Sequence, residues 1–228
     1  VATLRGAGTQ LAASQEVREP AMQARVMDAF RRASLVPDPP PIVGFQANAA
    51  NPHYEPRAGA DRRLAAGEVL LLDLWAGEKL GSVFADQTWM AYAGSTPGTE
   101  ERKIWGTVRA ARDAAVSLLK DRWAKRQPVT GAALDDAARG VISRAGYGEF
   151  FVHRTGHSID RDLHGSGPHL DNFETADERT LIGGVGFSVE PGIYLPGRFG
   201  MRTEINVYLG DSGPEVTPSR PQQELLFV

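Results

Sequence analysis

Two acidic residues interrupt apolar segments that otherwise have the pattern of buried strands. Asp73 lies within the segment Val69–Trp75, and Asp86 lies within residues 82–93. A strand that is apolar on both faces is typically buried on both, and a buried carboxylate is costly unless it is paired, hydrogen-bonded or bound to a metal. If the two segments form a hairpin, the two acids face each other, and such a pair favours a cation between them. An arginine or a backbone amide is the alternative partner.

Two further acids and one histidine extend this set. Glu190 and Glu204 lie in strand-like segments that a turn at Pro196-Gly197 can fold together, and His157 belongs to a cluster of histidines. Each alone is typical of a surface acid or a structural histidine. Together they offer four carboxylates and one imidazole, which suit Mn²⁺, Co²⁺, Fe²⁺ or Zn²⁺. Two such ions about 3.5–4 Å apart, bridged by carboxylates and a water, form a known hydrolytic device.

The elements that would position these residues indicate one α+β domain. Helical periodicity predicts helices over residues 20–33, 99–123 and 130–145, with Gly146 at the end of the last. The pattern predicts a short strand and a loop over 42–57, the hairpin over 69–75 and 82–93, and strands at 150–157, 185–195 and 200–209. Residues 1–14 are small and polar, and we expect a loosely held end there.

Composition excludes several classes of protein. The 228 residues contain no cysteine, so neither disulfides nor thiolate chemistry is available. No apolar run approaches the length of a membrane span. The net charge of −3 comes without a basic block, which argues against nucleic acid as a partner. The missing cysteines and the lack of a signal-peptide pattern favour the cytoplasm. The chain begins at Val1, which suggests processing or a piece of a longer protein.

The motifs around these residues resemble those of the pita-bread (M24) metallopeptidases, the family of prolidase, aminopeptidase P and methionine aminopeptidase. The resemblance implies an α+β pita-bread fold, in which helices cover a curved antiparallel sheet. It also implies one catalytic domain over residues 1–228 that lacks its N-terminal part. The matching stretches are Asn51-Pro52-His53-Tyr54, Leu72-Asp73, Ala85-Asp86-Gln87-Thr88, Thr155-Gly156-His157, Val189-Glu190-Pro191-Gly192-Ile193-Tyr194 and Gly200-Met201-Arg202-Thr203-Glu204.

The resemblance also implies roles for individual residues. Asp73 would hold one of two divalent ions, and Asp86 and Glu204 would bridge both. His157 and Glu190 would hold the second ion, and Glu190 would also act as the general base. The catalytic set would be completed by His53 and His164, which orient the substrate and steady the tetrahedral intermediate. The ions would be manganese first, with cobalt, zinc or iron as alternatives.

The implied reaction is hydrolysis of the N-terminal peptide bond of a short peptide, best of the Xaa-Pro type, by a metal-bridging hydroxide in a homodimeric enzyme. Two readings compete with it: a metal-free pita-bread binding module, and a creatinase-like hydrolase of a non-peptide C–N bond. Five intact ligands argue against both. His153 supports the site or only packs, and Arg202 contacts a substrate carboxylate or forms a salt bridge on a strand face.

The chain departs from the family pattern in three places. Asp73 and Asp86 are 13 residues apart, slightly more than is usual, and a longer turn near Gly77 and Gly81 would absorb the difference. Arg154 follows His153 where the family often has glycine. The stretch from Asp160 to Gly165 differs from the usual one, which bears on the substrate and not on the metals.

Overall fold

A long β-hairpin lies at the centre of the molecule. In the computed structural model, which describes residues 2–57 and 59–228, β2 (Val69–Ala76) and β3 (Ala85–Tyr92) pair antiparallel along their whole length. The short β1 (Ile42–Phe45) pairs antiparallel with β2, and β10 (Leu226–Phe227) pairs parallel with β3. The sheet order is therefore β1-β2-β3-β10, and the β10 pair departs from the purely antiparallel sheet expected from the sequence.

A second hairpin runs through the other half of the fold and changes sheets midway. Its first part pairs β5 (Gly186–Val189) with β8 (Ile205–Gly210), and its tip pairs β6 (Gly192–Leu195) with β7 (Phe199–Arg202). The short β4 (Ser158–Ile159) and β9 (Gly213–Thr217) complete a sheet of order β4-β5-β8-β9.

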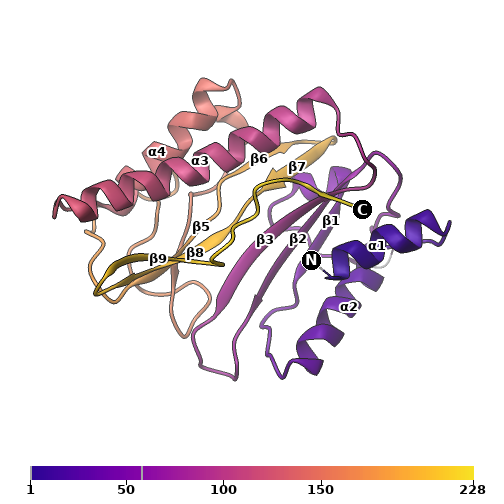
Figure 1. Ribbon diagram of the computed structural model, residues 1–228, viewed down its shortest axis with the longest axis horizontal. Coiled ribbons are helices and arrows are strands. Elements are labelled where there is room, and N and C mark those ends of the chain that lie inside the picture. Colours follow the sequence, from indigo (N-terminus) through magenta and orange to yellow (C-terminus); the bar gives the residue numbers. More distant parts are fainter. Residues whose placement is uncertain (1, 58) are drawn as a thin grey trace.

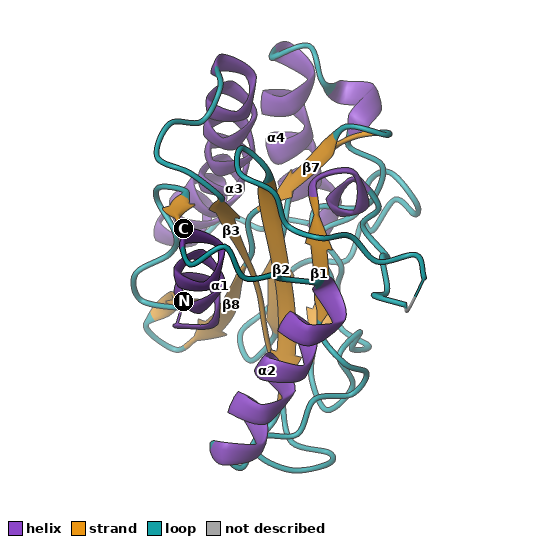
Figure 2. Ribbon diagram, turned by 90° about the vertical axis from the view of Figure 1, so that its right-hand side faces the viewer, coloured by secondary structure: helices purple, strands orange, loops and turns teal. Residues whose placement is uncertain are grey.

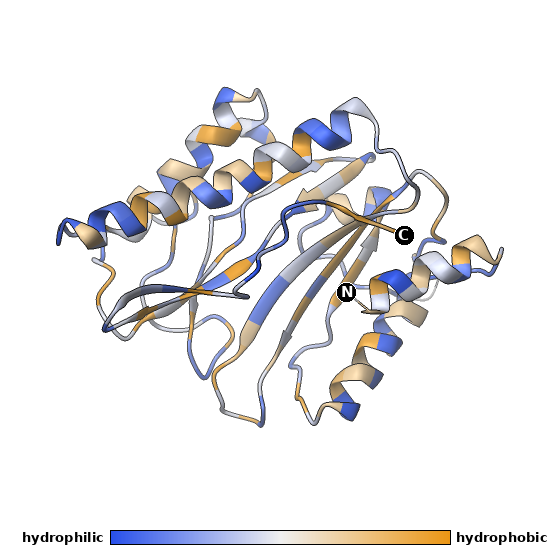
Figure 3. Ribbon diagram, viewed as in Figure 1, coloured by the Kyte–Doolittle hydropathy of each residue, from blue (hydrophilic) through white to orange (hydrophobic). Residues whose placement is uncertain are grey.

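Helices cover the strands from two sides (Figures 1 and 2). The long α3 (Thr99–Ala124) and α4 (Gly131–Arg144) pack together on one side, and α1 (Ala2–Ala12) and α2 (Glu19–Arg32) lie on the other. The 3-10 turns η1 (Gln46–Ala50) and η2 (Gly148–Phe150) make the connections. Polar and apolar residues alternate around the helices, as Figure 3 shows. Within the described parts of the chain, none of the helices combines the length and apolarity needed to cross a bilayer.

The strand β2 is buried on both faces because it separates two hydrophobic clusters. Val69 and Leu71 belong to the cluster that contains α3 and α4, whereas Leu70 and Leu72 pack against α1 and α2. Asp73 follows Val69 and Leu71 on the same face, since side chains alternate along a strand. The apolar run predicted this strand correctly, and its burial makes the charged residue within it conspicuous.

Several sequence predictions are confirmed and two are wrong. The central hairpin and the helices at 20–33, 99–123 and 130–145 are present with small shifts at their ends, and Gly146 adopts a φ of +88° just after α4. Residues 2–12 form α1 instead of a loose end, because Leu4 and Ala7 are fully buried against the second cluster; Val1 lies outside the described residues. Residues 150–157 do not form a strand.

The strands predicted at 185–195 and 200–209 are present and pair as a hairpin, but the structure divides them at Glu190-Pro191 and at Thr203-Glu204. Proline has no N–H with which to continue the ladder, so the pairing stops there. The register is the same on both sides of the break, since Val189 pairs with Ile205 and Gly192 pairs with Arg202.

Candidate active site

The central hairpin places two acids on one face. In the β2–β3 register Asp73 lies opposite Thr88, and Trp75 lies opposite Asp86. Asp73 and Asp86 are therefore diagonal neighbours, because residues two positions apart point to the same side. Both are buried, with 6% and 4% of their surface exposed. The side chain of Asn206 in β8 forms two hydrogen bonds with the Asp86 backbone, 2.9 Å from its N–H and 2.7 Å from its carbonyl oxygen, and so ties the two hairpins together.

The second hairpin contributes the other two acids exactly where its pairing stops. The unchanged register on both sides of the break sets Glu190 opposite Glu204. The gap between the two pairs of strands therefore places two carboxylates side by side. The Ser188 hydroxyl donates a hydrogen bond to Glu190 Oε1 at 3.1 Å, and the Thr88 hydroxyl lies 2.8 Å from Glu204 Oε2.

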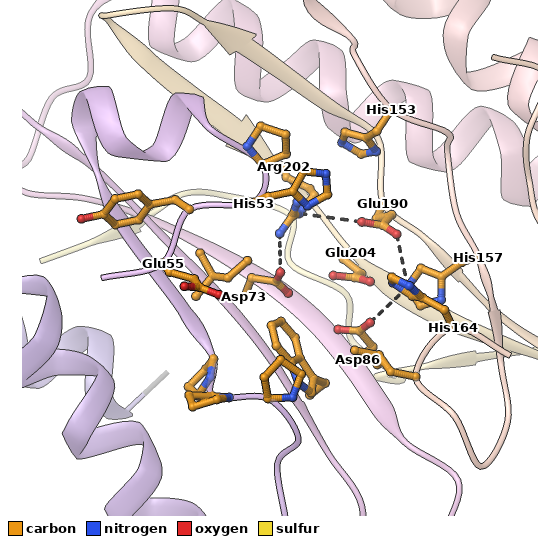
Figure 4. A pocket seen from close by; sticks show the side chains of 18 of the residues that line it. His53, Glu55, Asp73, Asp86, His153, His157, His164, Glu190, Arg202 and Glu204 are labelled. Atoms are coloured by element: carbon orange, nitrogen blue, oxygen red, sulfur yellow. Dashed lines mark hydrogen bonds and ion pairs between the residues drawn. The ribbon is translucent and has the colours of Figure 1, made fainter. Parts of the chain in front are cut away.

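His157 reaches the acids from the loop before β4 (Figure 4). Its Nε2 lies 3.3 Å from Asp86 Oδ2 and 3.4 Å from Glu190 Oε1. Its Nδ1 lies 3.0 Å from the carbonyl oxygen of Ser158, which can only accept a hydrogen bond. The proton of a neutral ring therefore sits on Nδ1, and the lone pair of Nε2 points at the acids. This is the orientation in which protein histidines bind metals.

Arg202 places a buried positive charge next to the acids. Its guanidinium pairs with Asp73 Oδ2, donates to the Thr88 hydroxyl at 2.9 Å and lies 3.3 Å from the Tyr194 hydroxyl. It is also 4.0 Å from Glu190. The sequence left open a substrate contact or a salt bridge on a strand face; the structure shows the salt bridge, with Asp73, buried inside the site.

Burial and mutual repulsion raise the pKa values of three of the four acids. Burial, with the charges of Asp86 and Glu190, raises the pKa of Asp73 to about 7 against the pull of Arg202. Burial likewise raises the pKa of Asp86, and it raises that of Glu204 well above its ordinary value. Burial opposes ionisation of Glu190 as well, but the charges of His157 and Arg202 bring its pKa below its ordinary value.

These residues fit a divalent cation. One ligand atom each from Asp86, His157 and Glu204 lies within 4.8 Å of the others. In the described residues, Asp86 Oδ1 and Glu204 Oε1 are buried without a hydrogen-bond partner. A buried carboxylate oxygen without a donor costs free energy, and a cation would remove both that cost and the repulsion that keeps protons on the acids.

All the residues that the sequence singled out line one cavity of about 510 Å³. His53 and His164 are exposed at its surface, and the His164 ring lies 4.3 Å from the ring of His157. His153 is buried; its Nδ1 donates to the carbonyl oxygen of Arg154, and its Nε2 lies 2.7 Å from the Tyr194 hydroxyl. Burial lowers the pKa of His153 to about 4, so the neutral ring accepts a hydrogen bond from Tyr194.

Sequence reasoning missed several residues that shape the site. Thr88 joins Arg202 to Asp73 and Glu204, and Tyr194 joins Arg202 to His153. The presence of both residues in the matching motifs was the one available signal. Glu19, at the start of α2, holds the loop that carries His53. Its buried carboxylate accepts hydrogen bonds from the Tyr54 hydroxyl at 2.6 Å and from the Arg62 N–H at 2.7 Å. Nothing in the sequence distinguishes it from an ordinary acid in the first turn of a helix.

The fold and the site together define a metallopeptidase domain of the pita-bread type. The chain matches the model of metallopeptidase family M24 over residues 3–211 and belongs to that family.

An Xaa-Pro dipeptidase of Lactobacillus helveticus is 34% identical over 163 residues, which are 72% of this chain and 40% of that protein. The probable dipeptidase PepE of Mycobacterium tuberculosis (strain ATCC 25618 / H37Rv) is 32% identical over 187 residues, 82% of this chain and 46% of that protein. This chain therefore spans less than half the length of these curated relatives.

Among solved structures, the X-Pro aminopeptidase of Thermotoga maritima superposes with a TM-score of 0.83 at 28% identity, over 99% of this chain and 59% of that one. The dipeptidase PepE of Mycobacterium ulcerans gives a TM-score of 0.80 at 30% identity, over 93% of this chain and 53% of that one. These likenesses confirm the pita-bread fold and the family that the motifs indicated.

Proposed function

We propose that this chain is the catalytic domain of a dinuclear metallo-exopeptidase that cleaves the first peptide bond of short peptides, with Xaa-Pro as the best substrate. One observation carries the proposal: two hairpins bring four acids into one cavity, the loop before β4 adds one histidine, and one buried oxygen each of Asp86 and Glu204 has no partner among the described residues. The names of the relatives support the choice of substrate.

The proposed ligands divide between two ions. Asp73 would hold one ion, His157 and Glu190 would hold the other, and Asp86 and Glu204 would be shared between them. When bound, such ions lower the pKa of water and polarise a carbonyl group. Manganese is the expected metal, and cobalt, zinc or iron would accept the same donors.

The residues of the chain then perform the proton transfers. Glu190 would take the proton of the attacking water; the guanidinium of Arg202, 4.0 Å away, lowers the pKa of its carboxyl group against the effect of burial and favours the ionised form that can accept a proton. His164 would donate a hydrogen bond to the oxyanion; partial burial of its ring is the main cause that lowers its pKa, to about 4, so the ring is neutral and carries one N–H. His53 orients the substrate at the mouth of the cavity.

Metal content tests the proposal before activity does. After reconstitution with Mn²⁺ and desalting, elemental analysis should find about two ions per chain. An Asp86→Asn variant should lose bound metal and hydrolysis, because it removes a bridging charge. Asp121→Asn is the matched control, since Asp121 lies exposed on α3 and pairs with Lys125. Unchanged metal content or turnover in Asp86→Asn would refute the ligand assignment.

A peptide panel then tests the substrate class. Xaa-Pro dipeptides should be hydrolysed faster than Met-Xaa peptides. A well-folded protein that retains metal and hydrolyses neither would overturn the exopeptidase proposal, and a folded protein that retains no metal would favour the binding module. The homodimer and the cytoplasmic location stay predictions, and light scattering in solution would test the first.

A further inference from the structure

One wall of the active-site cavity is apolar, and the chemistry described above does not use it. Pro39, Pro40, Pro41 and Ile42 line the cavity together with Trp75. The cavity volume of about 510 Å³ falls within the range of pockets that enclose small ligands. Such pockets are mostly apolar, with a few polar groups placed for chemistry. The wall therefore offers binding surface directly beside the acids.

The strand register explains why the prolines face the cavity. Ile42 pairs with Asp73, and Val36 forms an isolated bridge with Gly77. Between these two points, residues 37–41 must run beside residues 74–76, so the first segment has two residues too many for regular pairing. Prolines cannot donate to the ladder, and the segment bulges away from the sheet edge. The Gln23 side chain in α2 donates to the Pro41 carbonyl oxygen at 2.8 Å and holds the bulge in place.

Trp75 connects this bulge to the acidic cluster. It lies directly opposite Asp86 in the β2–β3 register and on the same face as Asp73. It is 6% exposed, and its indole Nε1 has no hydrogen-bond partner in the part of the chain that the structure describes. The ring is therefore held by packing alone, and it presents its apolar surface to the cavity.

We propose that Pro39, Pro40, Pro41 and Trp75 form a subsite for a bulky, uncharged apolar side chain or ring next to the scissile bond of the substrate. This proposal rests on the proposed function. Proline has a fixed φ, so the wall loses little conformational freedom when a ligand binds. None of the four offers a charge, so an acidic or basic side chain placed there would lose its hydration without gaining a partner.

Two pairs of dipeptides test the subsite and identify the substrate residue that enters it. Phe-Pro and Gly-Pro differ in the first residue, whereas Phe-Pro and Phe-Gly differ in the second. Trp75→Ala should lower kcat/KM for the bulky member of one pair about tenfold more than for its glycine partner. The pair whose kcat/KM ratio changes in Trp75→Ala shows whether the first or the second residue of the substrate occupies the subsite. An equal change for all substrates would overturn the proposal.

Further variants guard against a folding defect. Trp75→Phe should keep the preference, because the indole N–H that it removes has no partner. Pro40→Ser alters the wall at an exposed position and should weaken the preference in the same direction as Trp75→Ala. The matched control is Leu80→Ala, which removes an apolar side chain that is 76% exposed in the turn between β2 and β3. It should leave the kcat/KM ratio of both dipeptide pairs unchanged.

Binding separates failure of the subsite from failure of the proposed function. In calorimetry on chelator-treated protein, Phe-Pro should bind more tightly than Gly-Pro if the first residue occupies the subsite, or more tightly than Phe-Gly if the second does, and Trp75→Ala should remove the difference. Wild-type protein that shows this binding but hydrolyses no dipeptide would support the subsite and overturn the peptidase. Hydrolysis with no effect of Trp75→Ala on selectivity or binding would overturn the subsite alone, and neither hydrolysis nor selective binding would overturn both.

Discussion

The buried carboxylate of Glu19 provides a sharp test of how the site is supported. It accepts hydrogen bonds from the backbone N–H groups of Phe45 and Arg62, from the Tyr54 hydroxyl and from the Asn48 side chain, at 2.6–3.2 Å. These donors belong to the strand and loop that surround His53. Replacing Glu19 with glutamine keeps the size of the side chain but removes its charge and turns one acceptor into a donor.

The size of the effect follows from counting donors. If the glutamine oxygen serves Tyr54 and Arg62, its NH₂ group faces the Phe45 N–H, and that buried donor loses its partner at a cost of about 1–3 kcal/mol. The hydrogen bonds that remain go to a neutral acceptor instead of a charged one, which weakens each of them. We expect Glu19→Gln to lower the free energy of unfolding by about 3–4 kcal/mol, and the melting temperature by about 10 °C.

Urea unfolding monitored by circular dichroism measures this change. The control is Glu16→Gln, the same substitution at a half-exposed residue that pairs with Arg18, and it should cost less than about 0.5 kcal/mol. At a temperature where Glu19→Gln is folded, its metal content should match the wild type while kcat/KM falls, because the loop that carries His53 loosens. A loss of stability below about 1 kcal/mol would refute this account of the anchor.

Three further predictions concern other parts of the fold. Gly156→Ala would place a Cβ 2.0 Å from the Ser188 carbonyl oxygen, so the thermal midpoint and metal content should both fall, whereas Gly183→Ala, with open space around it, should change neither. The hydrogen bonds from Arg179 lower the pKa of Asp177 to about 2; because Arg179 is half exposed, the stabilisation is about 1 kcal/mol. This stabilisation is complete above pH 4 and lost as the pH falls toward 2, so the difference in urea stability between wild type and Asp177→Asn should shrink over that interval. Finally, Mn²⁺ at a hundred times its dissociation constant should stabilise chelator-treated protein by about 2.7 kcal/mol, and an unchanged melting temperature would contradict a site that forms only in the folded chain.

The periodic elements of this fold could be predicted from sequence because local pattern decides them. The helix at Thr99–Ala124 and the hairpin of β2 and β3 follow long apolar repeats. The helix at Ala2–Ala12 could not be predicted in this way, since its residues are small and its stability comes from burial of Leu4 and Ala7 against distant strands. The change of sheet at Glu190-Pro191 also depends on tertiary structure, although the proline marks its position.

The candidate site was predictable where residue type alone was informative. Acids within apolar strands, such as Asp73, are conspicuous in any sequence, and the family resemblance gave each of them an expected role. The supporting residues were not predictable, because their roles depend on partners far along the chain. Arg202 reaches Asp73 across 129 positions, and Asn206 reaches Asp86 across 120. The salt bridge on a strand face that the sequence offered for Arg202 is present, but its partner and its burial could not be predicted from the sequence.

The two-hairpin construction has a consequence for how the molecule reaches its folded state. Each hairpin closes through local contacts and holds its own pair of acids, so two half-sites can form before they meet. Their docking, fixed by Asn206 against the Asp86 backbone, then brings four carboxylates together against electrostatic repulsion. Divalent cations should therefore act late on the folding path. They should slow unfolding strongly and change the early collapse little, and the lifetime of the folded protein would then depend on the metal supply around it.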